Sequence, residues 1–256
     1  MTTRNWRVKN TRAGCGTMYF DCYIPSTPFV TSFTEVGSFN WVAPKKITSV
    51  EYLVVGGGGG GGGAYDTGSA GGGGAGLVVS GTLSVVPGTT YIITIGDGGD
   101  GGTNTDAGAA GTLSTFDTIT AAGGTGGRQS RDTTGSAGLG GDVASDPLGA
   151  TGGSGAGTNA GGENGGGGGG NTTAGGSTTT TPGISKDGGS GIVSSITGTA
   201  VTYGAGGDGG IVDTSSNGDD GAANTGNGGN GATTLNSDIK TGGKGGSGVV
   251  ILKYLI

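Results

Sequence analysis

The sequence predicts an all-β protein: a jelly-roll-like β-sandwich interleaved with a bundle of polyglycine II helices, with no α-helix. Three observations support this fold class. Glycine supplies 70 of the 256 residues, and all but Gly14, Gly16 and Gly37 lie between Gly56 and Gly248. Short runs rich in Val, Ile, Thr, Tyr and Phe, the residue types favoured in strands, border the glycine tracts. No segment shows the sustained 3.6-residue apolar period of an amphipathic helix.

The strands are expected where these runs occur. The first aromatic run includes Phe33, Val36, Phe39, Trp41 and Val42, and it predicts an opening hairpin that turns at Gly37 and supplies core side chains. The later strands are expected at Ile47–Val55, Leu77–Val86, Tyr91–Ile95, Thr112–Phe116, Thr118–Ala122, Ile192–Ile196, Val201–Tyr203 and Val249–Ile256. One sandwich domain over residues 31–256 therefore follows a leader of residues 1–30.

Four glycine excursions interrupt this framework, at residues 56–76, 96–111, 123–191 and 204–248. Several of them show an X-Gly-Gly period, in which a non-glycine residue recurs every third position. The X residues are Asp97, Asp100 and Thr103; Ala122, Thr125 and Arg128; Ala205, Asp208 and Ile211; and Thr241, Lys244 and Ser247. Extended helices with three residues per turn place every third residue on one side, and chains without Cβ atoms approach closely enough to hydrogen-bond laterally. We expect an ordered bundle with the X residues facing outward; the alternative is flexible linker.

The leader carries an excess of positive charge. Residues 1–46 hold six basic residues and two acidic ones, whereas the whole chain has a net charge of −6. A solvated leader and a docking segment for an acidic partner both fit this charge, and nucleic acid is the least favoured partner because no nucleic-acid-binding motif accompanies it. Cys15 and Cys22 are interpreted as inert thiols or as a small disulfide loop. No signal peptide and no membrane span are expected, since no apolar run is long enough.

Sites for catalysis, metals and cofactors are not expected. Histidine is absent, which removes the commonest general base and metal ligand. The phosphate-loop pattern fails at Gly243-Lys244, and the calcium repeat fails at Thr103. Asp97, Asp100 and Asp106 are interpreted as solvated carboxylates, with a hard-cation site as the alternative. The glycosylation sequon at Asn171 is interpreted as a coincidence.

Recognition residues are expected in the non-glycine interruptions of the tracts. Aromatic and arginine side chains dominate recognition surfaces, and loops carry function more often than regular elements. The receptor-contact candidates are Tyr65, Arg128, Arg131, Lys186 and Ile211. The alternative is that these segments only reverse the chain between glycine helices.

The order of five motifs resembles a known family. SFTEVGSFNWVAP (residues 32–44), SVEYLVVGGGGGGGGA, GTLSTFDTITAAGG, GIVSSITGTAVTYGAGG and GGKGGSGVVILKY are similar to the glycine-rich domain of bacteriophage tail-fibre and adhesin proteins. A more distant resemblance is to the extracellular glycine-rich domain of the anaplastic lymphoma kinase receptor. The phage resemblance implies a virion-surface protein that attaches to a host receptor or glycan, forms a homotrimer by analogy, and is assembled in the host cytoplasm.

Under this interpretation, residues 1–30 dock on another virion protein, with Arg4, Trp6, Arg7, Lys9 and Arg12 as docking candidates. The protein lacks the long shaft that usually precedes such a domain, so a fibre tip, a short fibre and a capsid-surface fibre all fit. Capsid or tail decoration without a receptor is the alternative function. Ice binding and glycan hydrolysis are less favoured, and the protein is not expected to be an enzyme.

Overall fold

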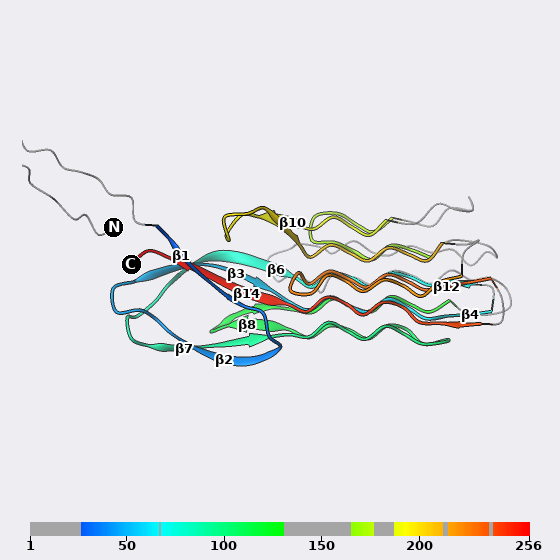
Figure 1. The fold of residues 1–256 in the computed structure, drawn as a ribbon, viewed down its shortest axis with the longest axis horizontal. Helices are drawn as coiled ribbons and strands as arrows, with labels where there is room; N and C mark the ends of the chain where they lie inside the picture. Colours follow the sequence, from blue (N-terminus) through cyan, green and yellow to red (C-terminus); the bar gives the residue numbers. More distant parts are fainter. Residues whose placement is uncertain (1–26, 67, 131–164, 177–186, 212–214, 236–237) are drawn as a thin grey trace, which may run out of the picture.

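A computed structural model describes residues 27–66, 68–130, 165–176, 187–211, 215–235 and 238–256. The molecule is elongated, with a β-sandwich at one end and wavy glycine segments running away from it (Figure 1). All regular elements among the described residues are strands, and none is an α-helix, as the sequence predicts. The strands are β1 (Phe29–Phe33), β2 (Gly37–Val42), β3 (Ser49–Val55), β4 (Ala64–Tyr65), β5 (Gly68–Ser69), β6 (Val78–Ser84), β7 (Thr90–Ile95), β8 (Ser114–Phe116), β9 (Ile119–Ala121), β10 (Ile192–Ser194), β11 (Val201–Tyr203), β12 (Thr233–Thr234), β13 (Ile239–Lys240) and β14 (Val249–Tyr254).

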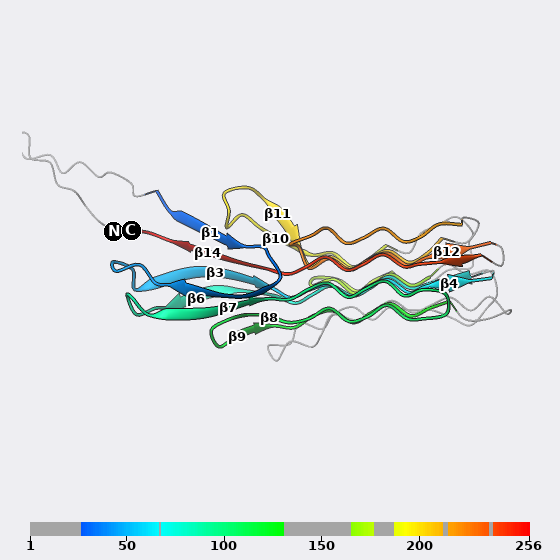
Figure 2. The same cartoon turned by 60° about the horizontal axis from the view of Figure 1, so that its bottom comes forward.

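Two four-stranded antiparallel sheets form the sandwich (Figure 2). Sheet 1 has the strand order β1-β14-β3-β6, and sheet 2 has the order β2-β7-β8-β9. Alternate residues of each strand point between the sheets, so the core collects Val50 and Val54 from β3, Ile93 from β7 and Phe116 from β8. Trp41 lies at its centre, with its ring centroid 5.8–5.9 Å from those of Tyr91, Phe116 and Tyr254.

The predicted opening hairpin is wrong. β1 pairs with β14 in sheet 1, whereas β2 pairs with β7 in sheet 2, so the chain crosses between sheets near Gly37. The crossing lets Phe33 and Phe39 face each other through the sandwich, with ring centroids 5.9 Å apart; in one hairpin they would share a sheet. The two valines of the run are not core residues, because Val36 and Val42 are exposed.

A small antiparallel hairpin, β10 paired with β11, covers part of the outer face of sheet 1. Ile196 and Tyr203 pack there against Leu53, Val55 and Ile251 in a second apolar cluster. Sheet 1 is therefore buried on both faces at the ends of β3 and β14 that adjoin the glycine bundle.

Residues 56–63, eight consecutive glycines, form the central helix of the bundle. Their N–H groups donate in rotation to three antiparallel segments, and the carbonyls of Gly57–Gly63 accept in rotation from three parallel segments, at N···O distances of 2.8–3.1 Å. The antiparallel segments are 70–77, 106–112 and 241–248, and the parallel segments are 96–103, 122–130 and 226–232. A rotation with period three in six directions is the hydrogen-bond pattern of polyglycine II packed hexagonally. The predicted ordered bundle is confirmed.

The six surrounding segments also bond to one another in a closed ring. The ring bonds, each written from the N–H donor to the carbonyl acceptor, are Gly73 to Gly229, Gly243 to Asn230, Gly242 to Gly102, Ala109 to Asp100, Gly108 to Gly127 and Gly71 to Arg128. A Cβ atom built on any of Gly56–Gly62 would overlap a backbone carbonyl of a neighbouring segment. Close approach of the backbones therefore requires glycine throughout this helix.

The X residues of the X-Gly-Gly repeats face outward as predicted. None of the twelve is buried, whereas most of the glycines between them are. Asp208 and several Asn and Asp residues outside these repeats have a role that the sequence analysis does not predict. Where a backbone N–H at the bundle surface lacks a neighbouring segment, an Asn or Asp side chain accepts its hydrogen bond instead. These pairs are Ala205 N–H to Asn227, Asp208 N–H to Asn230, Gly188 N–H to Asp208, Thr241 N–H to Asn217 and Lys244 N–H to Asp220.

Candidate functional site at the far end of the bundle

The far end of the bundle is built from four two-residue strands. β1 and the C-terminus lie at the sandwich end, whereas β4 and β12 lie at the opposite end (Figure 1). β4 pairs with β13, and β5 pairs with β12, both antiparallel. We call this region the tip and define it by β4, β5, β12 and β13 with the adjoining residues Arg128–Ser130, Ile211 and Leu235. The tip is where the central helix ends and the chain turns back.

Three apolar side chains are exposed on the tip. Tyr65, Leu235 and Ile239 are 41%, 41% and 57% exposed. Tyr65 is the register partner of Ile239, so both side chains stand on the same face of the β4–β13 ribbon. A tyrosine beside a β-branched aliphatic residue offers a rigid apolar contact with one polar atom, the combination favoured at recognition surfaces.

Arg128 lies at the same end on an outward position. Its carbonyl accepts a hydrogen bond from the Gly71 N–H at 2.9 Å, and the Ser130 N–H donates to the Gly63 carbonyl at 3.1 Å. These bonds hold the backbone of residues 128–130 against the end of the central helix, and Arg128 itself is exposed. The arrangement places an exposed positive charge at the same end of the bundle as the apolar residues.

Ile211 is positioned by a chain of hydroxyl groups. The Thr233 hydroxyl donates to the Ile211 carbonyl at 2.8 Å and lies 3.2 Å from the Ser69 hydroxyl. Ser69 and Thr233 are both buried, so this contact is shielded from water. It links three segments far apart in sequence, and it explains why small hydroxyl residues form β5 and β12.

The structure brings together the three described receptor-contact candidates: Tyr65, Arg128 and Ile211 all lie at the tip. Arg131 and Lys186 lie outside the described residues, as do the docking candidates Arg4, Trp6, Arg7, Lys9 and Arg12. Sequence reasoning missed Leu235 and Ile239 as individual candidates. Their signal was present, because both are large apolar residues in the interruption 235–240 of a glycine tract.

Comparison with protein families agrees with this architecture. The family model of the glycine-rich domain matches residues 33–255, which span the sandwich and the bundle together. The chain belongs to the glycine-rich domain family. A search of curated proteins finds no match to the sequence. The boundaries of the match show that this glycine-rich domain includes both the strands and the excursions, so the tip is an integral part of the domain.

Charged groups on the side of the bundle form an ion-pair cluster. The ammonium of Lys244 lies 3.0 Å from a carboxylate oxygen of Asp97 and 3.8 Å from one of Asp100. The hydrogen bond that the Lys244 ammonium donates to Asp97, together with the nearby carboxylates, raises the pKa of Lys244. The Lys244 ammonium thus lies beside two of the three carboxylates, Asp97 and Asp100, that were considered as a hard-cation site. Within the described residues, no group of three or more Cys, Asp or Glu side chains is arranged to hold a metal ion. The same part of the chain contains no helix that is long and apolar enough to cross a membrane.

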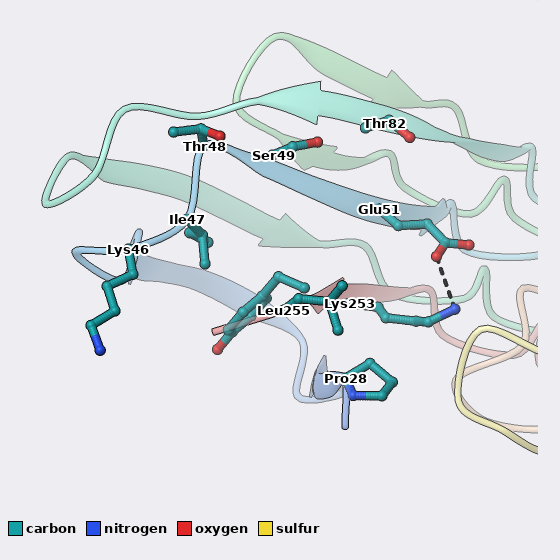
Figure 3. Close-up of a pocket in the computed structure, with 10 residues that line it drawn as sticks. Pro28, Lys46, Ile47, Thr48, Ser49, Glu51, Thr82, Lys253 and Leu255 are labelled. Carbon is teal, nitrogen blue, oxygen red and sulfur yellow. Dashed lines mark ion pairs between the residues drawn. The ribbon is translucent and has the colours of Figure 1, made fainter. Parts of the chain in front are cut away.

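A recess lies at the sandwich end, on the part of sheet 1 that the β10–β11 hairpin leaves uncovered (Figure 3). Its volume is about 530 Å³, and its lining includes Pro28, Glu51, Thr82, Lys253 and Leu255. Glu51 and Lys253 form an ion pair of 2.9 Å across neighbouring strands β3 and β14. Pro28, in the lining, is the second residue of the described chain and immediately precedes β1. The recess therefore lies at the sandwich end, opposite the tip.

Proposed function

We propose that this glycine-rich domain is a bacteriophage virion-surface protein, of tail-fibre or fibre-tip type, that attaches to a host receptor through its tip. The observation that supports the proposal most is the separation of the two ends. Both the entry of the described chain and its C-terminus lie at the sandwich, and the exposed Tyr65, Arg128 and Ile239 lie at the other end. An anchored protein that binds a receptor needs this polarity.

The bundle supplies the rigidity that presentation requires. The eight glycines of the central helix extend about 25 Å at about 3.1 Å per residue. Each of their N–H groups is hydrogen-bonded, and six neighbours enclose the helix. Loops held on a rigid support lose little conformational entropy when they bind, which favours affinity.

At the sandwich end we propose docking on another virion protein through residues 1–30, and assembly as a homotrimer on the virion exterior after synthesis in the host cytoplasm. The recess supports the location of the docking end, because its lining includes Pro28, the second residue of the described chain. A binding role, without catalysis, accounts for the exposed apolar and basic side chains of the tip. The runner-up function is a non-receptor capsid or tail decoration, which uses the same docking end.

Phage carrying Tyr65→Ala, Arg128→Ala and Ile239→Ala together tests the attachment function. We expect normal incorporation of the protein into virions, with adsorption to host cells reduced at least tenfold. The matched control is Asp100→Ala, Ala110→Ser and Thr120→Ala, three exposed positions on the side of the bundle and on the sandwich, away from the tip. Unchanged adsorption by the tip variant, in virions that contain the protein, contradicts receptor attachment and favours decoration.

A further inference from the structure

Among the described residues, segment 226–232 lacks one of the six neighbours that a hexagonal bundle provides. The segment 226–232 has five hydrogen-bonded neighbours among the described residues, whereas the central helix has six. The five are the central helix and segments 70–77, 204–211, 216–222 and 241–248. The vacant sixth position forms a groove whose walls are 204–211 and 216–222 and whose floor is 226–232. A recess of about 300 Å³ lies in it, lined by Ile211, Ser216, Asn217, Asp219, Asn230 and Gly231 among others.

The floor of the groove carries unused acceptors. Around a polyglycine II helix, directions that receive N–H groups alternate with directions that carry carbonyls. Segment 226–232 donates to the central helix and to both walls, and its carbonyls accept from 70–77 and 241–248. The alternation assigns the sixth direction to the carbonyls of Gly228 and Gly231, and no N–H group of the described residues donates to either.

A further glycine strand does not fit the groove. Such a strand would accept hydrogen bonds from the N–H groups of Ala205 and Asp208 on one wall. The side chains of Asn227 and Asn230 already accept them, at 3.0 and 2.8 Å. These side chains occupy the acceptor positions that an added backbone would fill. The groove is closed to extension of the bundle, yet it keeps a recess large enough for a small polar molecule.

We propose that this groove binds a neutral glycan of the host surface. Adjacent sugar hydroxyls donate to the Gly231 carbonyl and the Asp219 carboxylate and accept from side-chain amide groups such as that of Asn230. Ile211 offers an apolar wall to the C–H face of a sugar ring. Asp219 lines the recess with an exposed side chain, and its carboxylate repels an anionic saccharide. A few convergent polar groups in a concave site are the usual means of orienting such a ligand.

The proposal deepens the attachment function and rests on it for the source of the ligand. Ile211 belongs both to the groove and to the tip, so the two sites adjoin each other at this residue. A glycan in the groove contributes to attachment only if this end of the bundle faces the host. The site itself is defined without the tip side chains, which allows the two hypotheses to be tested separately.

The experiment measures binding of the full chain to lactose, maltotriose, mannotriose and N,N′,N″-triacetylchitotriose, with 3′-sialyllactose as the charged counterpart of lactose, by saturation-transfer NMR and calorimetry. We expect at least one neutral saccharide to bind, and 3′-sialyllactose to bind at least tenfold more weakly than lactose if lactose is a ligand. Asp219→Ala removes an exposed carboxylate from the recess and should weaken binding at least tenfold. Asp106→Ala, an exposed carboxylate on another side of the bundle, should change it less than twofold.

Absence of binding by all four neutral saccharides at millimolar concentration overturns the proposal. Equal saccharide affinity of the Asp219→Ala and Asp106→Ala variants also overturns it. A third contradicting result is that no saccharide binds but a hexaglycine peptide does, with an affinity that Asp219→Ala lowers. Adsorption assays separate the two hypotheses. Loss of adsorption in the tip variant without saccharide binding overturns the glycan site alone, whereas saccharide binding with unchanged adsorption in both tip and groove variants overturns the attachment function.

Discussion

Adding one methyl group to the central helix should destabilise the whole domain. A Cβ atom on Gly59 would overlap the carbonyl of Thr125 in the neighbouring segment. Six neighbours enclose the helix, so it has no direction in which to move. Gly59 donates to the Gly74 carbonyl at 2.8 Å and accepts from the Gly229 N–H at 2.9 Å, and a shift of either segment weakens these buried bonds.

The magnitude follows from three effects. Overpacking in an enclosed site costs about 1–3 kcal/mol. Each buried backbone group left without a partner costs a further ~1–3 kcal/mol. Reduced freedom of the unfolded chain returns about 0.4–1 kcal/mol for a Gly-to-Ala change. We expect Gly59→Ala to lower the free energy of unfolding by about 3–5 kcal/mol, which corresponds to a Tm lower by roughly 10 °C at about 2–4 °C per kcal/mol.

Urea unfolding of a graded series measures this effect. Gly108 lies in an edge segment, where the same overlap, with the Gly60 carbonyl, is relieved by outward movement, so Gly108→Ala should cost less than Gly59→Ala. Ala110→Leu adds three carbons on an exposed position and should change stability by less than about 0.5 kcal/mol. If Gly59→Ala fails to fold, Gly108→Ala still gives the intermediate value. Equal stabilities for Gly59→Ala, Gly108→Ala and the parent protein would refute close packing around the central helix.

Two further predictions concern polar contacts. The side chain of Asn171, the residue of the sequon, accepts from the Val78 N–H and donates to the carbonyls of Gly76 and Gly204, so it links its own segment to two others. Asn171→Ala should therefore lower the free energy of unfolding, measured in urea, by about 2–3 kcal/mol. A change no larger than that caused by Ser38→Ala, at an exposed position, would contradict this role. Burial raises the pKa of Tyr203, and the hydrogen bond to Asp97 raises that of Lys244. The folded state therefore holds both protons more tightly, and stability should fall as pH rises above the ordinary values of 10.0 and 10.5. Tyr203→Phe should reduce this loss of stability, measured by thermal unfolding between pH 8 and 11. An unchanged pH profile would contradict a contribution of the Tyr203 hydroxyl to it.

The bundle was predictable because its determinant is local. The X-Gly-Gly period places Asp97, Asp100 and Thr103 on one side of a three-residue helix whatever the neighbours are, and the exposed positions follow directly. Strand positions were predictable for the same reason, since β-branched and aromatic residues around Val54 and Ile251 favour extended backbone.

Pairing between distant segments was not predictable from local pattern. Phe33 and Phe39 fit a hairpin equally well, and only the competing partners β14 and β7 place them in different sheets. The tip ribbon of Tyr65 with Ile239 likewise depends on a contact across most of the chain. The acceptor role of Asn227 and Asn230 had a visible signal, the repeat Asn-Gly-Gly-Asn, whose meaning depends on knowing which neighbour is absent.

Amide hydrogen exchange tests the rigid support of the tip most directly. All eight N–H groups of Gly56–Gly63 are hydrogen-bonded within a closed ring of segments, so their exchange requires opening of the bundle. Mass spectrometry of peptides spanning residues 50–63 should show these glycines exchanging as slowly as the β3 residues Leu53–Val55. Exchange of the glycines within seconds, beside protected β3 residues, would contradict an ordered polyglycine bundle and remove the support on which the tip is proposed to be presented.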